Sequence, residues 1–143
     1  MLDESVLRAV SLYFYLSLPD EKRAHSASIS AINKIQKLPS STNRAMIVNI
    51  LHRIRPKAMR FRVRFWPFKK GEVTWVMPNP KLDLQIWRNF TQRAVAEESE
   101  AVLFSRILGF TDSEIAAGLN VSEGTVRYRV GRGLRTLGGI AGG

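Results

Sequence analysis

Small residues followed by four arginines lie between Ser122 and Arg135, and this stretch has the side chains best suited to bind nucleic acid. An arginine offers a planar fork of N–H donors, which matches a phosphate or the O6 and N7 atoms of guanine. Residues with small side chains at the start of the stretch allow a close approach to base edges. The candidate DNA contacts are Ser122, Glu123, Gly124, Thr125, Arg127, Tyr128, Arg129, Arg132 and Arg135.

Two short helices joined by a tight turn are predicted to position these side chains. Thr111 and Glu114 have the spacing of a capping box, Asn120 suits a left-handed helix end, and Ser122 can cap the next helix. Apolar residues at steps of four, four and three form the inward stripe of that second helix: Val126, Val130, Leu134 and Leu137. Together these signals predict a helix-turn-helix whose second helix enters the major groove of DNA. The alternative is an ordinary helical hairpin with a solvated basic face.

The same residues resemble region 4 of bacterial sigma factors, above all that of the extracytoplasmic-function group. The resemblance covers roughly residues 94–139, and LuxR-type regulators are more distant relatives. The matching positions are Glu114-Ile115-Ala116, Gly124-Thr125-Val126, Arg132 and Leu137. The resemblance implies that the recognition helix binds the minus-35 promoter element. Gly131 and Gly133 depart from the pattern, since each glycine inside a helix costs up to about 1 kcal/mol relative to alanine.

The net charge of +10 is spread unevenly along the chain. Residues 1–21 hold four acids and one arginine, residues 22–71 hold thirteen Lys or Arg and no acid, and residues 72–143 hold eight of each sign. A basic block this one-sided favours a polyanionic partner, most often nucleic acid. A merely solvated basic surface is the alternative.

The N-terminal half is predicted to be helical up to Arg55 and to form a β-hairpin after it. Helices are expected from Asp3 or Ser5 to about Leu18, from Pro19 to Lys37, and from Asn43 to Arg55, where Pro56 ends the third. The period then changes to two, which predicts a hairpin at about 60–77 with a basic outer face. Its candidate phosphate or anion contacts are Arg60, Arg62, Arg64, Lys69 and Lys70.

The predicted fold is therefore mainly α, with a small β-hairpin among N-terminal helices and a helical C-terminal domain. Pro78-Asn79-Pro80 is the predicted joint between a basic domain at 1–78 and a helix-turn-helix domain at 81–138. The second domain begins with a helix at Leu84 that breaks near Val95 or continues, followed by a supporting helix over Glu97–Leu108. The end, 139–143, is expected to be a flexible tail too rich in glycine to hold a helix.

Several kinds of chemistry have no support in the sequence. Without cysteine there is no disulfide, thiolate metal site or thiol nucleophile. We find no Ser/His/acid set, metal-spaced cluster or phosphate-binding glycine loop, so no enzyme, metal or cofactor is predicted. His25 is expected at the surface rather than as a ligand. Apolar runs are too short to span a bilayer and the acidic start is no signal peptide, so a cytoplasmic protein without membrane contact is expected.

Three functions fit these patterns. The leading hypothesis is a sequence-specific transcription regulator that binds double-stranded DNA, with the basic N-terminal part adding phosphate contacts. The second is a short, divergent sigma factor that also binds RNA polymerase. The third is an adaptor that binds an anionic ligand or a protein partner. The sequence does not give the DNA target, the regulated genes, an activating or repressing role, or the oligomeric state.

Overall fold

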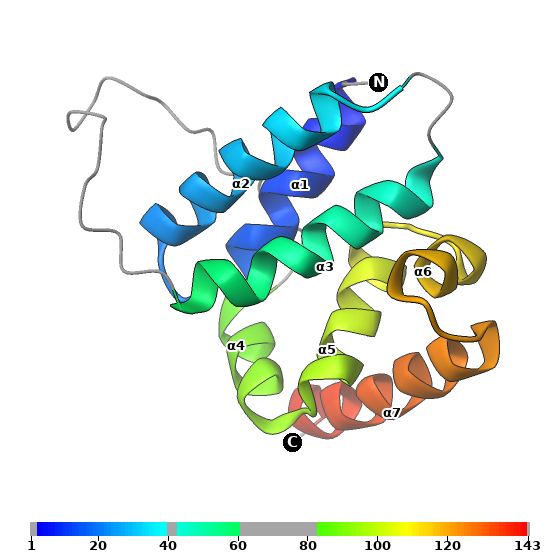
Figure 1. Ribbon diagram of the computed structural model, residues 1–143. Helices are drawn as coiled ribbons and strands as arrows, with labels where there is room; N and C mark the ends of the chain where they lie inside the picture. The colour runs from blue at the N-terminus through cyan, green and yellow to red at the C-terminus, as the bar shows by residue number, and fades with distance from the viewer. Residues whose placement is uncertain (1–2, 40–42, 61–82, 143) are drawn as a thin grey trace. The chain divides into compact units, whose positions relative to one another are not determined.

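The structure is a computed structural model that describes residues 3–39, 43–60 and 83–142. Every regular element in these ranges is a helix, which confirms the mainly α prediction (Figure 1). The elements are α1 (Glu4–Ser17), α2 (Glu21–Gln36), α3 (Arg44–Arg60), α4 (Leu84–Arg93), α5 (Ala96–Val102), the π-helical turn η1 (Leu103–Ile107), α6 (Asp112–Leu119) and α7 (Glu123–Ala141). None of the helices in these ranges has the length and hydropathy that crossing a membrane requires.

The chain divides into two compact units. The first unit comprises Met1–Thr42 and Ile50–Pro80, and the second comprises Asn43–Asn49 and Lys81–Gly143. The range of α3 is thus shared between them. The predicted joint at 78–80 lies outside the described residues, and the proposed domain boundaries stay a prediction.

Capping carboxylates start the first two helices of the first unit. Asp3 Oδ1 accepts a hydrogen bond from the backbone N–H of Val6 at 2.9 Å, and Asp20 Oδ1 accepts one from that of Arg23 at 2.8 Å. These bonds satisfy N–H groups that have no partner inside the helix. The apolar faces of α1 and α2 then pack against each other, and they bury side chains with 0% exposure: Val10, Tyr13, Phe14, Ala31 and Ile35. Both helices were predicted from the sequence.

The third helix is longer than predicted. Pro56 does not end it, because α3 continues for one more turn to Arg60. A proline inside a helix removes one hydrogen bond and crowds the preceding turn. Good helix formers follow it, however, and the buried Ile54 anchors this part of α3 in the first unit. Arg60 is therefore helical rather than the first residue of a strand, and the rest of the predicted hairpin, 61–77, lies outside the described residues.

His25 was expected at the surface but lies buried within α2, with 7% of its surface exposed. Burial lowers the pKa of this imidazole, because the charged form loses its hydration. The prediction failed because the neighbouring serines and alanines are small enough to occur on either face of a helix, so they do not show which face is buried.

The first helices of the second unit and the loop after them contain buried aromatic side chains that pack in pairs. Asp83 caps α4, which ends at Arg93, and α5 begins at Ala96, so of the two alternatives left open by the sequence the chain takes the break near Val95. The supporting helix is α5 continued by η1, and its wider π-helical turn includes Phe104. The rings pack edge to face in two pairs, at 5.2 Å between the centroids of Trp87 and Phe90 and 5.9 Å between those of Phe104 and Phe110.

Two glycines of α7 have opposite surroundings. A Cβ atom on Gly133 would lie 2.5 Å from Val102 Cγ2 and 2.9 Å from the carbonyl oxygen of Glu98, so only glycine lets α7 approach α5 this closely. A Cβ on Gly131 would meet nothing within 4 Å. Gly133 therefore has a packing function, whereas Gly131 contributes only flexibility.

The helix α7 also continues through Gly138 and Gly139 to Ala141, so the expectation that this end holds no helix is wrong. Extending an existing helix fixes one residue for each hydrogen bond gained, which is far easier than starting one. The backbone N–H of Gly142 still donates to the carbonyl oxygen of Gly138 at 2.9 Å.

These surroundings predict opposite effects for two matched substitutions. Gly131→Ala should raise the free energy of unfolding of the second unit by about 0.5–1 kcal/mol, since alanine is the better helix former. Gly133→Ala should lower it by about 1–3 kcal/mol, because Val102 and the Glu98 carbonyl must shift. Denaturant titration of both variants checks this. Equal effects of the two alanines would contradict the close approach at Gly133.

Candidate nucleic-acid interface

The first helix of the candidate interface, α6, begins and ends as predicted. Thr111 Oγ1 accepts from the backbone N–H of Glu114 at 3.1 Å, and the Glu114 carboxylate accepts from the N–H of Thr111 at 2.9 Å. This reciprocal pair is a complete capping box. At the other end Asn120 adopts the left-handed conformation, with φ 57° and ψ 48°. The chain then turns sharply enough for the next helix to begin three residues later.

The second helix, α7, starts with a hydroxyl cap. Ser122 Oγ accepts from the backbone N–H of Thr125 at 3.0 Å and lies 2.9 Å from Thr125 Oγ1. Both hydroxyls, predicted as DNA contacts, thus also hold the first turn of α7 in shape. Backbone N–H groups at such a helix start suit contact with a phosphate oxygen.

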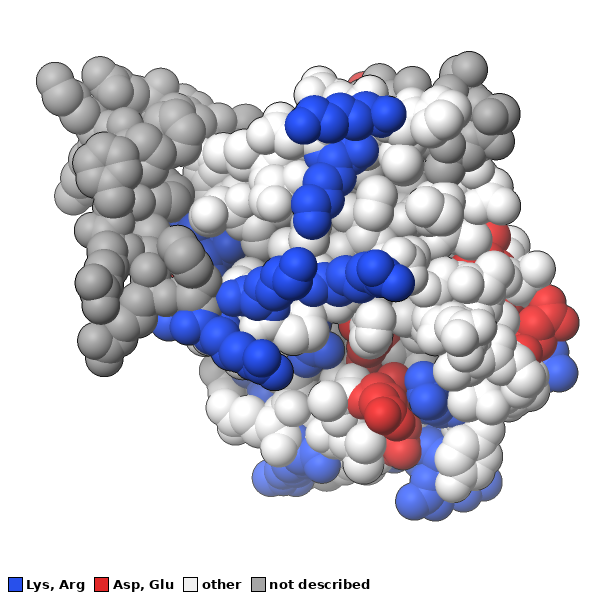
Figure 2. Space-filling view, in the orientation of Figure 1, with Lys and Arg blue, Asp and Glu red and all other residues white. Residues whose placement is uncertain are grey.

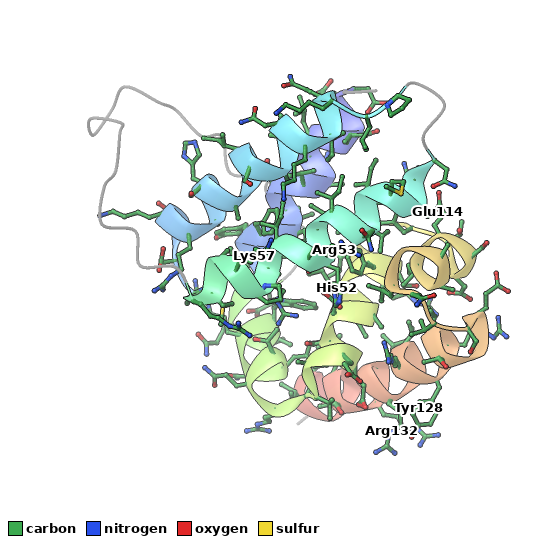
Figure 3. The ribbon with its side chains drawn as sticks, viewed as in Figure 1. His52, Arg53, Lys57, Glu114, Tyr128 and Arg132 are labelled. Atoms are coloured by element: carbon green, nitrogen blue, oxygen red, sulfur yellow. The ribbon has the colours of Figure 1, made fainter. Side chains whose placement is uncertain are left out.

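The rotation of α7 is fixed by its buried valines. Val126 and Val130 are 0% and 5% exposed. Since successive residues rotate by about 100° around a helix, Tyr128 lies roughly opposite Val126 and is 64% exposed. Figure 3 shows Tyr128 and Arg132 projecting from the same side of α7, away from α5. The exposed residues of α7 among the candidates are Glu123, Gly124, Arg127, Tyr128, Arg132 and Arg135.

Arg127 is accessible to a ligand in spite of a nearby acid. Its side chain is 62% exposed, and its NH1 atom lies 4.0 Å from Asp112 Oδ2. An exposed ion pair at that distance contributes little stability, because water screens the charges. The guanidinium can therefore leave the carboxylate and bind a phosphate or a guanine edge.

Arg129 differs from the other arginines of α7. Its side chain is only 22% exposed, and its NH2 atom lies 3.6 Å from Glu97 Oε2. The pair joins α7 to the start of α5. Arg129 thus also helps to position the recognition helix, and its contact with DNA stays a prediction.

The contact of residues 43–49 with α6 was not predicted from the sequence, although a helix was expected there. Arg44 Nε lies 3.1 Å from Glu114 Oε2, and the Arg44 guanidinium carbon lies 4.6 Å from the centroid of the Phe110 ring. Asn49 Nδ2 donates to the carbonyl oxygen of Gly118 at 2.9 Å. A Cβ on Gly118 would lie 2.6 Å from the Val48 side chain. This part of α3 therefore supports α6 from the side, and the glycine inside α6 was the one available signal.

Of the five predicted anion contacts at 60–70, only Arg60 lies within the described residues. Arg60 is the exposed last residue of α3. The other four predicted anion contacts, Arg62, Arg64, Lys69 and Lys70, lie outside the described residues. Their role stays a prediction.

Comparison with known proteins identifies the helix-turn-helix formed by α6 and α7. Residues 96–137 match the family described as Sigma-70, region 4. This helix-turn-helix is sigma region 4-like. No curated protein matches the chain.

Two solved structures resemble the fold of nearly the entire chain. One is the sigma factor RpoE from Bartonella quintana, solved in complex with the anti-sigma factor NepR; it has a TM-score of 0.71 and 20% identity, covering 95% of this chain and 91% of that chain. The other is CnrH, solved in complex with the cytosolic domain of CnrY; it has a TM-score of 0.60 and 17% identity, covering 96% of this chain and 80% of that chain. At these identities the likeness shows the fold alone.

The sigma region 4-like geometry makes Arg127 the first candidate for base recognition. Arg127→Ala should relax the preference at one or two adjacent base pairs, because a bidentate Arg–guanine pair gives roughly 1–3 kcal/mol of discrimination. Arg127→Lys should restore little, since lysine lacks the planar fork. Selection of bound sequences from random duplex DNA checks both variants.

The matched control for this selection is Arg106→Ala, which removes an exposed arginine from η1. It should leave the selected sequence unchanged. If Arg127→Ala also leaves it unchanged, Arg127 takes no part in the readout.

Proposed function

We propose that this chain is a sequence-specific DNA-binding transcription regulator whose α7 enters the major groove. The observation that carries the proposal is the outward face of α7, which presents exposed Arg127, Tyr128 and Arg132 on a helix that is capped by Ser122. The match of residues 96–137 to sigma region 4 supports it. The small side chains at the start of α7 allow this end of the helix to come close to base edges, as the major-groove geometry of helix-turn-helix proteins requires.

The arginines of α7 divide into two roles under this proposal. Arg127 lies in the second turn of the helix, close to the cap, and reads bases. Arg132 and Arg135 lie one to two turns further on and neutralise phosphates, which position the protein but carry no sequence information. Basic residues of the N-terminal part add further phosphate contacts. The protein acts where bacterial DNA is transcribed, in the cytoplasm, and works by binding rather than by catalysis.

The division of roles is measurable through salt. Each phosphate contact contributes about −0.9 to the slope of log K against log salt concentration. The double variant Arg132→Ala/Arg135→Ala should therefore flatten the slope by roughly 2 and weaken binding to selected and random duplexes alike. Arg127→Ala is the control and should keep the slope while losing the preference for the selected duplex. An unaltered slope in the double variant would overturn the phosphate role.

A second candidate function, a short and divergent sigma factor, is favoured by one observation. The likeness to RpoE extends over 95% of this chain and so includes the N-terminal helices. A sigma factor would bind core RNA polymerase and direct it to a promoter. Co-purification with core polymerase and promoter-dependent run-off transcription would establish this function. Binding to duplex DNA without any association with polymerase would contradict the sigma-factor function and leave only the transcription-regulator function.

A further inference from the structure

A basic groove lies in the first unit between α2 and the second half of α3. Its cavity has a volume of about 230 Å³. The residues that line it are Arg23, Ser26, Ala27, Ser30, Lys34, Ile54, Lys57 and Ala58. On α2 they lie three, four, seven and eleven residues after Arg23, so one face of that helix forms one wall. Figure 3 marks Lys57 on α3, which forms the other wall.

The groove combines an apolar floor with a cationic rim. Ala27 and Ile54 are only 4% and 6% exposed, so they form the buried base. The hydroxyls of Ser26 and Ser30 add hydrogen-bond donors on exposed positions of α2. Lys34 and Lys57 are exposed, one on each wall. A ligand in this groove would meet positive charge from both sides and an apolar surface beneath.

The two lysines of the groove are not paired with an acid within the described part of the chain. Residues 22–60 contain nine Lys or Arg and no acid. Arg23 NH1 pairs with Asp20 Oδ2 at 2.8 Å, but no described acid lies within ion-pair distance of Lys34 or Lys57. Figure 2 shows Lys and Arg side chains gathered over α2 and α3, with no acid between them. Like charges that line one groove repel each other, and a bound polyanion would relieve the repulsion.

We propose that this groove binds a small polyphosphate ligand, of the class of nucleoside di- and triphosphates. Lysine is a compact point charge that suits phosphate oxygens, and serine hydroxyls donate to the same atoms. The volume of about 230 Å³ is below the 300–1,000 Å³ typical of pockets that enclose drug-sized ligands, so the groove holds the phosphate chain and leaves the rest of the ligand outside it. The proposal does not depend on α7 reading DNA, because all the lining residues belong to the first unit.

Calorimetric titration of the full chain at about 0.15 M salt tests the proposal, because at that ionic strength diffuse attraction is screened beyond about 8 Å. The probes are inorganic pyrophosphate, ATP and GTP. The variant Lys34→Gln/Lys57→Gln should weaken their binding by roughly tenfold or more, since it removes two charged donors. The matched control, Lys22→Gln/Lys37→Gln, removes the same charge from exposed positions that do not line the groove, and should change affinity less than about threefold.

Two results would overturn the proposal. Equal weakening in both double variants would mean that net charge attracts the anion and the groove does not. Binding of a single-stranded oligonucleotide that depends on Lys34 and Lys57, with none of the three small probes bound, would assign the groove to a nucleic-acid backbone. Thermal unfolding of each variant shows whether it is folded, and Lys34→Arg/Lys57→Arg, which keeps both charges, should retain binding within a few fold.

Discussion

The left-handed turn at Asn120 is the constraint on which the helix-turn-helix depends. Most residues are disfavoured in this conformation, and asparagine is one of the few that tolerate it. The turn ends α6, brings the N–H of Val121 to the carbonyl oxygen of Ala116 at 3.0 Å, and allows Ser122 to start α7. The buried Val126 and Val130 then fix the rotation of the helix. The outward face of α7 follows from these few local interactions.

The features that were predicted correctly from the sequence depend on local interactions. The capping box of Thr111 and Glu114, the Asn120 turn and the Ser122 cap each involve residues within a few positions of one another. Such features depend on side-chain chemistry and spacing, both of which a single sequence displays. The break near Val95 was only one of two alternatives that the sequence left open.

Features that depend on tertiary contacts were missed or misjudged. The bond from Asn49 to Gly118 joins residues 69 positions apart, and no local pattern marks it. Gly133 counted as a helix weakness, yet its lack of a side chain is what lets Val102 pack against α7. Pro56 was given too much weight as a helix breaker, since its cost is overcome in a helix with a buried anchor. The groove between α2 and α3 was not predicted either, because the composition shows how many basic residues this segment has and not which of them lie together in the fold.

The central claim is that the outward face of α7 lies in the major groove, and cross-linking tests it most directly. A photoreactive benzoylphenylalanine would replace Tyr128 in one variant and Arg106 on η1 in another, and each would be irradiated on a selected duplex. The account predicts cross-links from position 128 to bases at one defined place in the duplex, and few from position 106. Efficient cross-links from position 106 with none from position 128 would contradict it.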